Sequence, residues 1–112
     1  MTLSVAREFS SVPGPRSRDE GPFSAEQFRE ELLHPRFKKA EEAGETLVVD
    51  LDGGCGYATS FLEEAFGGLA RELSSPEMVL KVLEIKSDEE PYLCDDVTTY
   101  IVEATTGAQV AR

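Results

Sequence analysis

Residues 47–62 read LVVDLDGGCGYATSFL and combine an apolar run, a glycine-rich loop and two hydroxyl residues at the expected start of a helix. The apolar run at 47–51 is short and is closed by Asp52-Gly53-Gly54, which is typical of a strand buried on both faces of an α/β sheet. We therefore expect residues 47–51 to form the central strand of the sheet.

The segment after Thr59-Ser60 predicts a helix that ends near Pro76. Its apolar residues recur at helical spacing: Leu62, Ala65, Phe66, Leu69, Ala70 and Leu73. Gly67-Gly68 interrupts the pattern at a cost of about 1 kcal/mol per glycine relative to alanine. We interpret this pair as a sign that the turn packs closely against a neighbour.

Three features precede the central strand. Residues 3–9 alternate weakly between apolar and polar side chains, which predicts an edge strand, and the Pro-, Gly- and Arg-rich residues 12–22 predict a surface loop. A helix should follow, with Ser24 as its N-cap and Gln27 completing a capping box. Pro35 should end or kink this helix, because proline lacks a backbone donor and clashes with the preceding turn.

Two further elements follow the predicted 60–73 helix. Residues 78–85 alternate like a strand, and a last amphipathic helix carries Leu93, Val97, Tyr100, Ile101 and Ala104. The order of the elements predicts a single α/β domain over residues 1–112, with a mixed sheet and helices packed mainly on one face. Its core should span about residues 14–104, with the edge strand 3–9 added at the N-terminus.

Composition limits the classes of partner. The 112 residues carry a formal net charge of −11, which disfavours nucleic acid and anionic membrane surfaces and favours a basic partner. The N-terminus lacks a signal-peptide pattern, and no run approaches the ~20 apolar residues of a membrane span, so we expect a cytoplasmic protein. Cys55 and Cys94 match no metal-ligand spacing. We therefore expect neither a metal nor a cofactor.

Two ligand-binding hypotheses apply to the glycine-rich loop. Gly53, Gly54 and Gly56 are not followed by the Lys-Ser/Thr of a phosphate-binding loop, which disfavours a nucleotide site. Asp50-Leu51-Asp52-Gly53 resembles the nucleophile motif of haloacid-dehalogenase phosphatases, but the larger sheet of those enzymes is missing. A small phosphatase-like or nucleotide-binding domain that uses Asp50 and Asp52 is the alternative function. The interpretation that we favour is a non-enzymatic protein, so we assign no catalytic residue.

Two blocks of sequence carry a family resemblance. Residues 17–24 read SRDEGPFS and are followed by Phe28-Arg29-Glu30, and residues 56–69 read GYATSFLEEAFGGL. Both blocks resemble the STAS-like domains of unknown function found in bacteria and archaea, which are related to the STAS anti-sigma-factor antagonists. The similarity covers roughly residues 14–104 and implies a STAS-like fold.

The resemblance implies a non-enzymatic regulatory module that binds another protein. In the antagonists, a hydroxyl at the start of the helix after the central strand is phosphorylated by a kinase of the histidine-kinase-like ATPase superfamily, and the phosphorylated form releases that kinase. Thr59 matches this hydroxyl by position, and Ser60 stands beside it. Ala58 and Phe61 stand where the antagonists usually have Asp and Gly. Ser60 also fits a purely structural role, as an N-cap in a capping box with Glu63.

The predicted partner-binding surface is the segment from the glycine loop into the helix. Its residues are Gly53, Gly54, Gly56, Tyr57, Thr59, Phe61, Glu63 and Glu64. Because STAS-like folds place their early connection near this end of the sheet, we expect Arg16 and Arg18 to lie close to the start of the 60–73 helix. The two arginines would then offset acidic charge around Asp52 and Glu63.

Overall fold

Three short strands form a sheet in the order β1 (Thr2–Ser4), β2 (Leu47–Asp50) and β3 (Leu83–Lys86). The structure is a computed structural model that describes the backbone of residues 1–110 and the side chains of residues 1–104. The apolar run forms the central strand, as predicted. Both strand pairs are parallel, so the sheet is parallel rather than mixed. Helical crossovers between the strands return the chain to the same end of the sheet each time.

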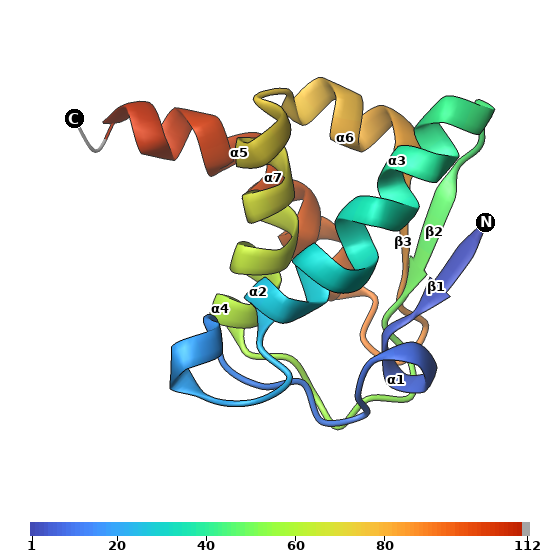
Figure 1. The fold of residues 1–112 in the computed structure, drawn as a ribbon, viewed down its shortest axis with the longest axis vertical. Coiled ribbons are helices and arrows are strands. Elements are labelled where there is room, and N and C mark those ends of the chain that lie inside the picture. The colour runs from blue at the N-terminus through green and yellow to red at the C-terminus, as the bar shows by residue number, and fades with distance from the viewer. Residues whose placement is uncertain (111–112) are drawn as a thin grey trace.

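Two long helices and α7 pack on one side of this sheet (Figure 1). The first long helix comprises α2 (Ala25–Phe28), the π-helical segment η2 (Arg29–Leu33) and α3 (His34–Ala43). The second comprises α4 (Thr59–Leu62), the π-helical segment η3 (Glu63–Gly67) and α5 (Gly68–Leu73). The other helices are α1 (Val5–Glu8), the 3₁₀ turn η1 (Arg18–Glu20), α6 (Pro76–Val82) and α7 (Tyr92–Val110). Over residues 1–110, none of the helices has the length and apolar character needed to cross a bilayer.

The sheet buries one of its two faces. Leu3, Leu47 and Val49 point to the same face and are fully buried, whereas Val48 and Asp50 are only half-buried. Alternation of side chains along a strand places the second set on the opposite face. The helices therefore cover mainly one face, as predicted, but the expectation that residues 47–51 are buried on both faces is wrong.

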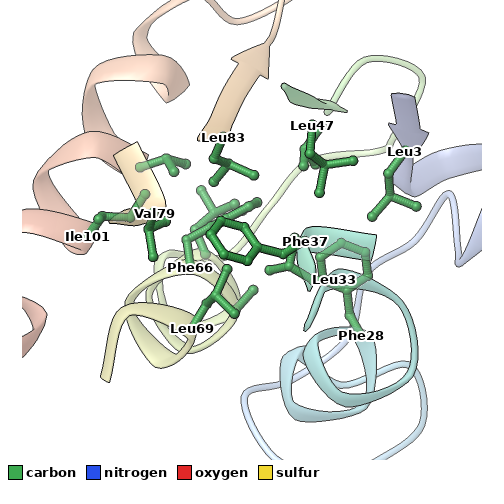
Figure 2. Packing of buried hydrophobic residues seen from close by; sticks show 14 of the residues in the cluster. Leu3, Phe28, Leu33, Phe37, Leu47, Phe66, Leu69, Val79, Leu83 and Ile101 are labelled. Atoms are coloured by element: carbon green, nitrogen blue, oxygen red, sulfur yellow. The ribbon is translucent and has the colours of Figure 1, made fainter. Parts of the chain in front are cut away.

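The core lies between the buried face of the sheet and the helices. Figure 2 shows its side chains converging from the strands, the two long helices, α6 and α7. Phe28, Phe37 and Phe66 are fully buried there, and Ile101 of α7 is 1% exposed. The predicted inward residues of the second and last helices are thus core residues, with Leu73 and Tyr100 at its margin.

The edge strand is shorter than the predicted residues 3–9. It ends at Ser4, whose Oγ accepts a hydrogen bond of 3.2 Å from the N–H of Arg7 and so caps helix α1. An N-cap serine starts a helix by satisfying one of its unpaired N–H groups. The alternation of Leu3 and Val5 therefore crosses a strand-to-helix boundary.

The predicted strand at 78–85 is wrong for its first half. Residues up to Val82 form α6, because Ser75 caps the helix through its Oγ, 3.1 Å from the N–H of Met78, and Pro76 opens it. Proline is well suited to the first helical position, where its missing N–H has no helical partner. The Ser-Pro pair that marks the end of the preceding helix is also the start of this one.

The helix that begins after Ser24 does not end at Pro35. Ser24 caps it as predicted, with its Oγ accepting from the N–H of Gln27 at 3.1 Å. Pro35 lies in the first turn of α3, directly after the π-helical segment η2, and the chain stays helical as far as Ala43. The local irregularity at the proline is the π-helical turn before it, and Gly44 in a left-handed conformation ends the helix.

Phe66→Ala should lower the free energy of unfolding by about 3–5 kcal/mol, because the side chain is fully buried and its loss leaves a cavity. Leu80→Ala on α6 is the control, since Leu80 is 40% exposed, and it should change stability by less than about 0.5 kcal/mol. Urea denaturation followed by circular dichroism measures both. Equal effects of the two substitutions would contradict this core.

Candidate functional site

The glycine-rich loop leaves the carboxyl end of β2 and enters α4. Its start is a tight turn in which Asp50 Oδ1 accepts from the N–H of Asp52 at 2.9 Å. Gly53 and Gly56 have φ of 90° and 127°, values that favour glycine over residues with a side chain. The N–H of Cys55 donates to the carbonyl of Ser11 at 2.8 Å, so the loop is also tied to the early part of the chain.

Asp52 connects this loop to the loop after β3. Its Oδ1 accepts from the N–H of Glu89 at 2.9 Å, and its Oδ2 accepts from the N–H of Asp88 and from Lys86 Nζ, both at 3.0 Å. These three donors, with the backbone bonds contributing most, lower the pKa of Asp52 to about 2. Bonding to Asp52 and Asp88 raises the pKa of Lys86. Both oxygens of Asp52 are therefore engaged in holding two loops together.

A polar hollow of about 460 Å³ lies at this end of the sheet. Its lining residues are Ser4, Ala6, Arg7, Ser11, Asp50, Asp52, Gly53 and Glu89. Ser4 and Asp50 pair across β1 and β2, so the hollow lies at the carboxyl ends of neighbouring parallel strands. Within the part of the chain that the structure describes, no group of three or more His, Cys, Asp or Glu side chains is arranged to hold a metal ion.

The two aromatic residues of the predicted surface point inward. Phe61 is 1% exposed, with its ring centroid 6.0 Å from that of Phe28 and 6.0 Å from that of Tyr57. The Tyr57 hydroxyl donates to the carbonyl of Leu51 at 2.9 Å, and burial together with the nearby charge of Asp50 raises its pKa. Phe61 is thus a core residue and not a partner contact, because the first turn of α4 directs it beneath the first long helix.

Thr59 and Ser60 are the first two residues of α4. Thr59 is exposed and Ser60 is half-buried. Ala58 occupies the N-cap position and the helix has no side-chain cap, so the predicted capping role of Ser60 is wrong. The helix starts before Ser60, which leaves this serine inside the first turn.

Glu63 and Glu64, one turn further along, are bound by three arginines. Arg16 Nη1 lies 2.7 Å from Glu63 Oε1 and 3.1 Å from Glu64 Oε1. The other oxygens pair with Arg71 at 2.7 Å from Glu63 and with Arg29 at 2.6 Å from Glu64. The hydrogen bond from Arg71, and then that from Arg16, lower the pKa of Glu63. These carboxylates are therefore paired within the chain rather than presented as open acidic surface.

The early loop contacts the predicted 60–73 helix through Arg16, as expected. Arg16 reaches the second long helix, whereas Arg18 Nη2 pairs with Glu30 Oε1 of the first long helix at 2.9 Å. The carboxylate of Asp52 is paired with Lys86 instead of with either arginine. The loop therefore uses its two basic residues to bind different helices.

Arg29 has a structural role that the sequence pattern does not predict. Its side chain is 9% exposed and also donates from Nε to Glu72 at 3.0 Å and from Nη1 to the carbonyl of Glu64 at 2.8 Å. A Cβ at Gly68 would lie 2.5 Å from Arg29 Nη1, so glycine makes room for the guanidinium. The Gly67-Gly68 pair did predict close packing, but nothing local in the sequence names arginine as the neighbour.

Comparison with known proteins finds a match to one family. A family model described as STAS-like domain of unknown function (DUF4325) matches residues 24–93, which is more than half of the chain. The matched segment includes both long helices, β2, β3 and the glycine-rich loop. Neither a curated protein nor a solved structure matches the chain.

Gly68→Ala should destabilise the protein by about 1–3 kcal/mol, although alanine is the better helix former, because the new methyl group displaces a buried guanidinium. The matched control is the same substitution in an Arg29→Ala background, where the obstacle is gone and the change should be neutral or stabilising. Urea denaturation of the four chains gives this comparison. A destabilisation of the same size in both backgrounds would contradict the role of Arg29.

Asp52→Asn should flatten the acid limb of the stability profile. The pKa of Asp52 in the folded state is about 2, below its ordinary value of 3.8. Its contribution is therefore fully present above about pH 4 and is lost as the pH falls toward 2. Unfolding free energies measured in urea between pH 6 and pH 2 should fall less steeply in Asp52→Asn than in the parent. Glu84→Gln, at an exposed position on β3, should retain the parental slope.

Proposed function

The chain belongs to the family of STAS-like domains of unknown function, and on this premise we propose that it is a non-enzymatic protein-interaction module switched by phosphorylation of Thr59. STAS-like domains are regulatory or interaction modules, which is the broader basis of the proposal. The phosphorylation switch and the choice of Thr59 go beyond what the family description says and are the specific part of the proposal.

One observation carries the choice of residue. Thr59 is an exposed hydroxyl at the first position of the helix that follows the central strand, and no side chain caps that helix. The STAS antagonists that this chain resembles carry their phosphorylated hydroxyl at the same place in the order of elements. Ser60 is the second candidate, because it is adjacent and has no capping role.

The charges around Thr59 are compatible with a phosphate. Unpaired N–H groups and the positive end of a helix favour negative charge at its first residues. Glu63 and Glu64 would repel a phosphate if they were unpaired, but their carboxylates are already bound to arginines. The local repulsion is therefore weaker than the sequence alone suggests.

The proposed docking surface is the glycine-rich loop together with the start of α4. At Gly56, where φ is 127°, an added Cβ would have no described heavy atom within 4 Å, so a partner can approach the backbone there. The net charge of −11 on the whole chain favours the long-range approach of a basic partner. We propose a kinase of the histidine-kinase-like ATPase superfamily as that partner. Phe61 is not part of this surface.

A second candidate function is supported by the polar hollow beside Asp50. Ligands in α/β sheets commonly bind outside the carboxyl ends of the strands, which is where this hollow lies. A phosphatase-like site would use Asp50, since both oxygens of Asp52 are bound by neighbours. Turnover of a phosphate ester with magnesium that is abolished by Asp50→Asn would favour this candidate over the switch.

Thr59→Glu should weaken partner binding by about tenfold or more, roughly 1.4 kcal/mol, while Thr59→Ala should bind like the parent and resist phosphorylation. The partner is identified from an extract of the native host, and its dissociation constant for each purified chain is measured by calorimetry. Thr99→Glu, an exposed position on α7, controls for the added charge and should bind normally.

The proposal also requires phosphate on the native protein. Mass spectrometry of the chain isolated from its host should find phosphorylation within residues 59–60. Unchanged affinity of Thr59→Glu for the partner, together with an unmodified chain, would leave an interaction module without a switch.

A further inference from the structure

We infer that the loop between β3 and α7, residues 87–92, extends the docking surface and binds a positively charged segment of the partner. The ring of Tyr92 supplies a cation–π contact to a lysine or arginine of that segment, and Asp88 supplies the opposite charge. This inference rests on the proposed function, because it names the chemistry that the same docking surface recognises.

Hydrogen bonds join this loop to the glycine-rich loop. Asp52 Oδ1 accepts from the N–H of Glu89 at 2.9 Å, and its Oδ2 accepts from the N–H of Asp88 at 3.0 Å. In the opposite direction, the N–H of Gly53 donates to Glu89 Oε1 at 3.0 Å. The two loops follow the carboxyl ends of parallel neighbours, β2 and β3, and leave the same end of the sheet (Figure 1). A partner that covers the glycine-rich loop is therefore within reach of the loop after β3.

The backbone of the loop is held in place while its side chains face solvent. Ser87 is 6% exposed, and its Oγ donates to the carbonyl of Glu90 at 2.8 Å. This bond and those to Asp52 fix the backbone from residue 87 to residue 90. The side chain of Asp88 is nevertheless 80% exposed. A loop that is already ordered avoids most of the free energy that ordering costs on binding.

Tyr92, the first residue of α7, is the exposed aromatic residue of this surface. It is 58% exposed, whereas Phe61 is 1% exposed. Its hydroxyl donates to Glu90 Oε2 at 2.7 Å, which restrains the side chain at the edge of the loop. A cation over the face of a tyrosine ring is attracted by the ring, and the adjacent carboxylate attracts the same cation. Tyrosine and arginine are also the residue types that contribute most to binding at protein interfaces.

Negative charge at the loop exceeds the positive charge beside it. Lys86 Nζ lies 3.1 Å from Asp88 Oδ2 and is shared with Asp52 at 3.0 Å. Among residues 1–104, whose side chains the structure describes, no basic side chain pairs with Glu89 or Glu90. The charged groups thus favour a cationic segment over a neutral or acidic one. They differ in this from Glu63 and Glu64, which arginines of the chain already bind.

The first test uses the full chain and a defined probe, a short peptide of alternating arginine and alanine with blocked ends. Amide NMR spectra recorded during a titration should change mainly at residues 53–57 and 87–92. Replacing the arginines of the peptide by neutral citrulline should abolish these changes. Changes spread evenly over the acidic surface, or centred on the acidic residues 41–45, would overturn the inference. Magnesium chloride that shifts the same amides and displaces the peptide would indicate a metal-binding loop and also overturn it.

Variants separate the two contacts. Tyr92→Ala should weaken peptide binding about threefold, as expected for an exposed cation–π contact, and Tyr92→Phe should retain most of it because the ring makes the contact. Asp88→Asn should weaken binding and reduce its dependence on salt. Leu80→Ala and Glu42→Gln, at exposed positions on α6 and α3, are the controls and should bind like the parent. Equal losses in Asp88→Asn and Glu42→Gln would indicate only attraction to net charge and overturn the inference.

The same variants are then measured with the purified partner by calorimetry. Tyr92→Ala should weaken the complex and Leu80→Ala should leave it unchanged, and equal affinity of Tyr92→Ala and the parent would overturn the inference. This result is separable from that of the proposed function. Neither titration requires a phosphate, so they can fail while Thr59→Glu still weakens partner binding. Conversely, a clear effect of Tyr92 with no phosphate on the native chain would overturn the switch and leave the docking chemistry intact.

Discussion

The sheet has one apolar face, and both long helices must reach it. Three strands of three or four residues offer room for two helices side by side, so the helices also meet each other above the sheet. Where they meet, the contact is partly ionic: Arg29 crosses from the first helix to Glu64 and Glu72 of the second. Burying a guanidinium is costly unless carboxylates pair with it, so Arg29 depends on both glutamates. It also depends on the space that Gly68 leaves, because a side chain there would collide with it. We call this contact, together with the arginines Arg16 and Arg71 that bind Glu63, the charged seam. It determines which turns of the two helices can face each other.

The same seam gives the candidate site its surroundings. Arg29 opens the π-helical segment of the first long helix, and Glu63-Glu64 open that of the second. π-helical turns are rare and are frequently found at functional sites. Here the two irregular turns carry the paired charges, and the regular turn before the second one carries Thr59. The exposed hydroxyl of Thr59 therefore lies one turn before the part of the helix that the ion pairs hold in place.

Local patterns were enough to predict the central strand, the two long helices and the one-sided packing. These depend on runs and periodicities that a short window contains, such as residues 47–51 and the apolar stripe through Phe66. The errors occurred where one pattern had two local solutions. Residues 78–82 alternate as a strand would, but Ser75-Pro76 starts a helix through them. Phe61 stands at a helix start, where a residue can face solvent or the core, and only the position of the first long helix decides for the core. Arg16 was expected near Glu63 from the family resemblance, but Arg29 could not be predicted as the partner of Glu64, because the two residues are 35 positions apart and no local pattern connects them.

Net charge gives a misleading picture of the second long helix, which begins at Thr59. The chain as a whole carries −11, but the seam balances three arginines, Arg16, Arg29 and Arg71, against three glutamates, Glu63, Glu64 and Glu72. A surface that already carried several unpaired carboxylates would change little in relative terms on gaining a phosphate. Where the charges along the helix are already paired, a phosphate stands out, since a phosphoryl group adds between one and a half and two negative charges at pH 7. The pairing that the arginines provide along this helix is thus what would make a single phosphate at its start a large change for a partner that docks there.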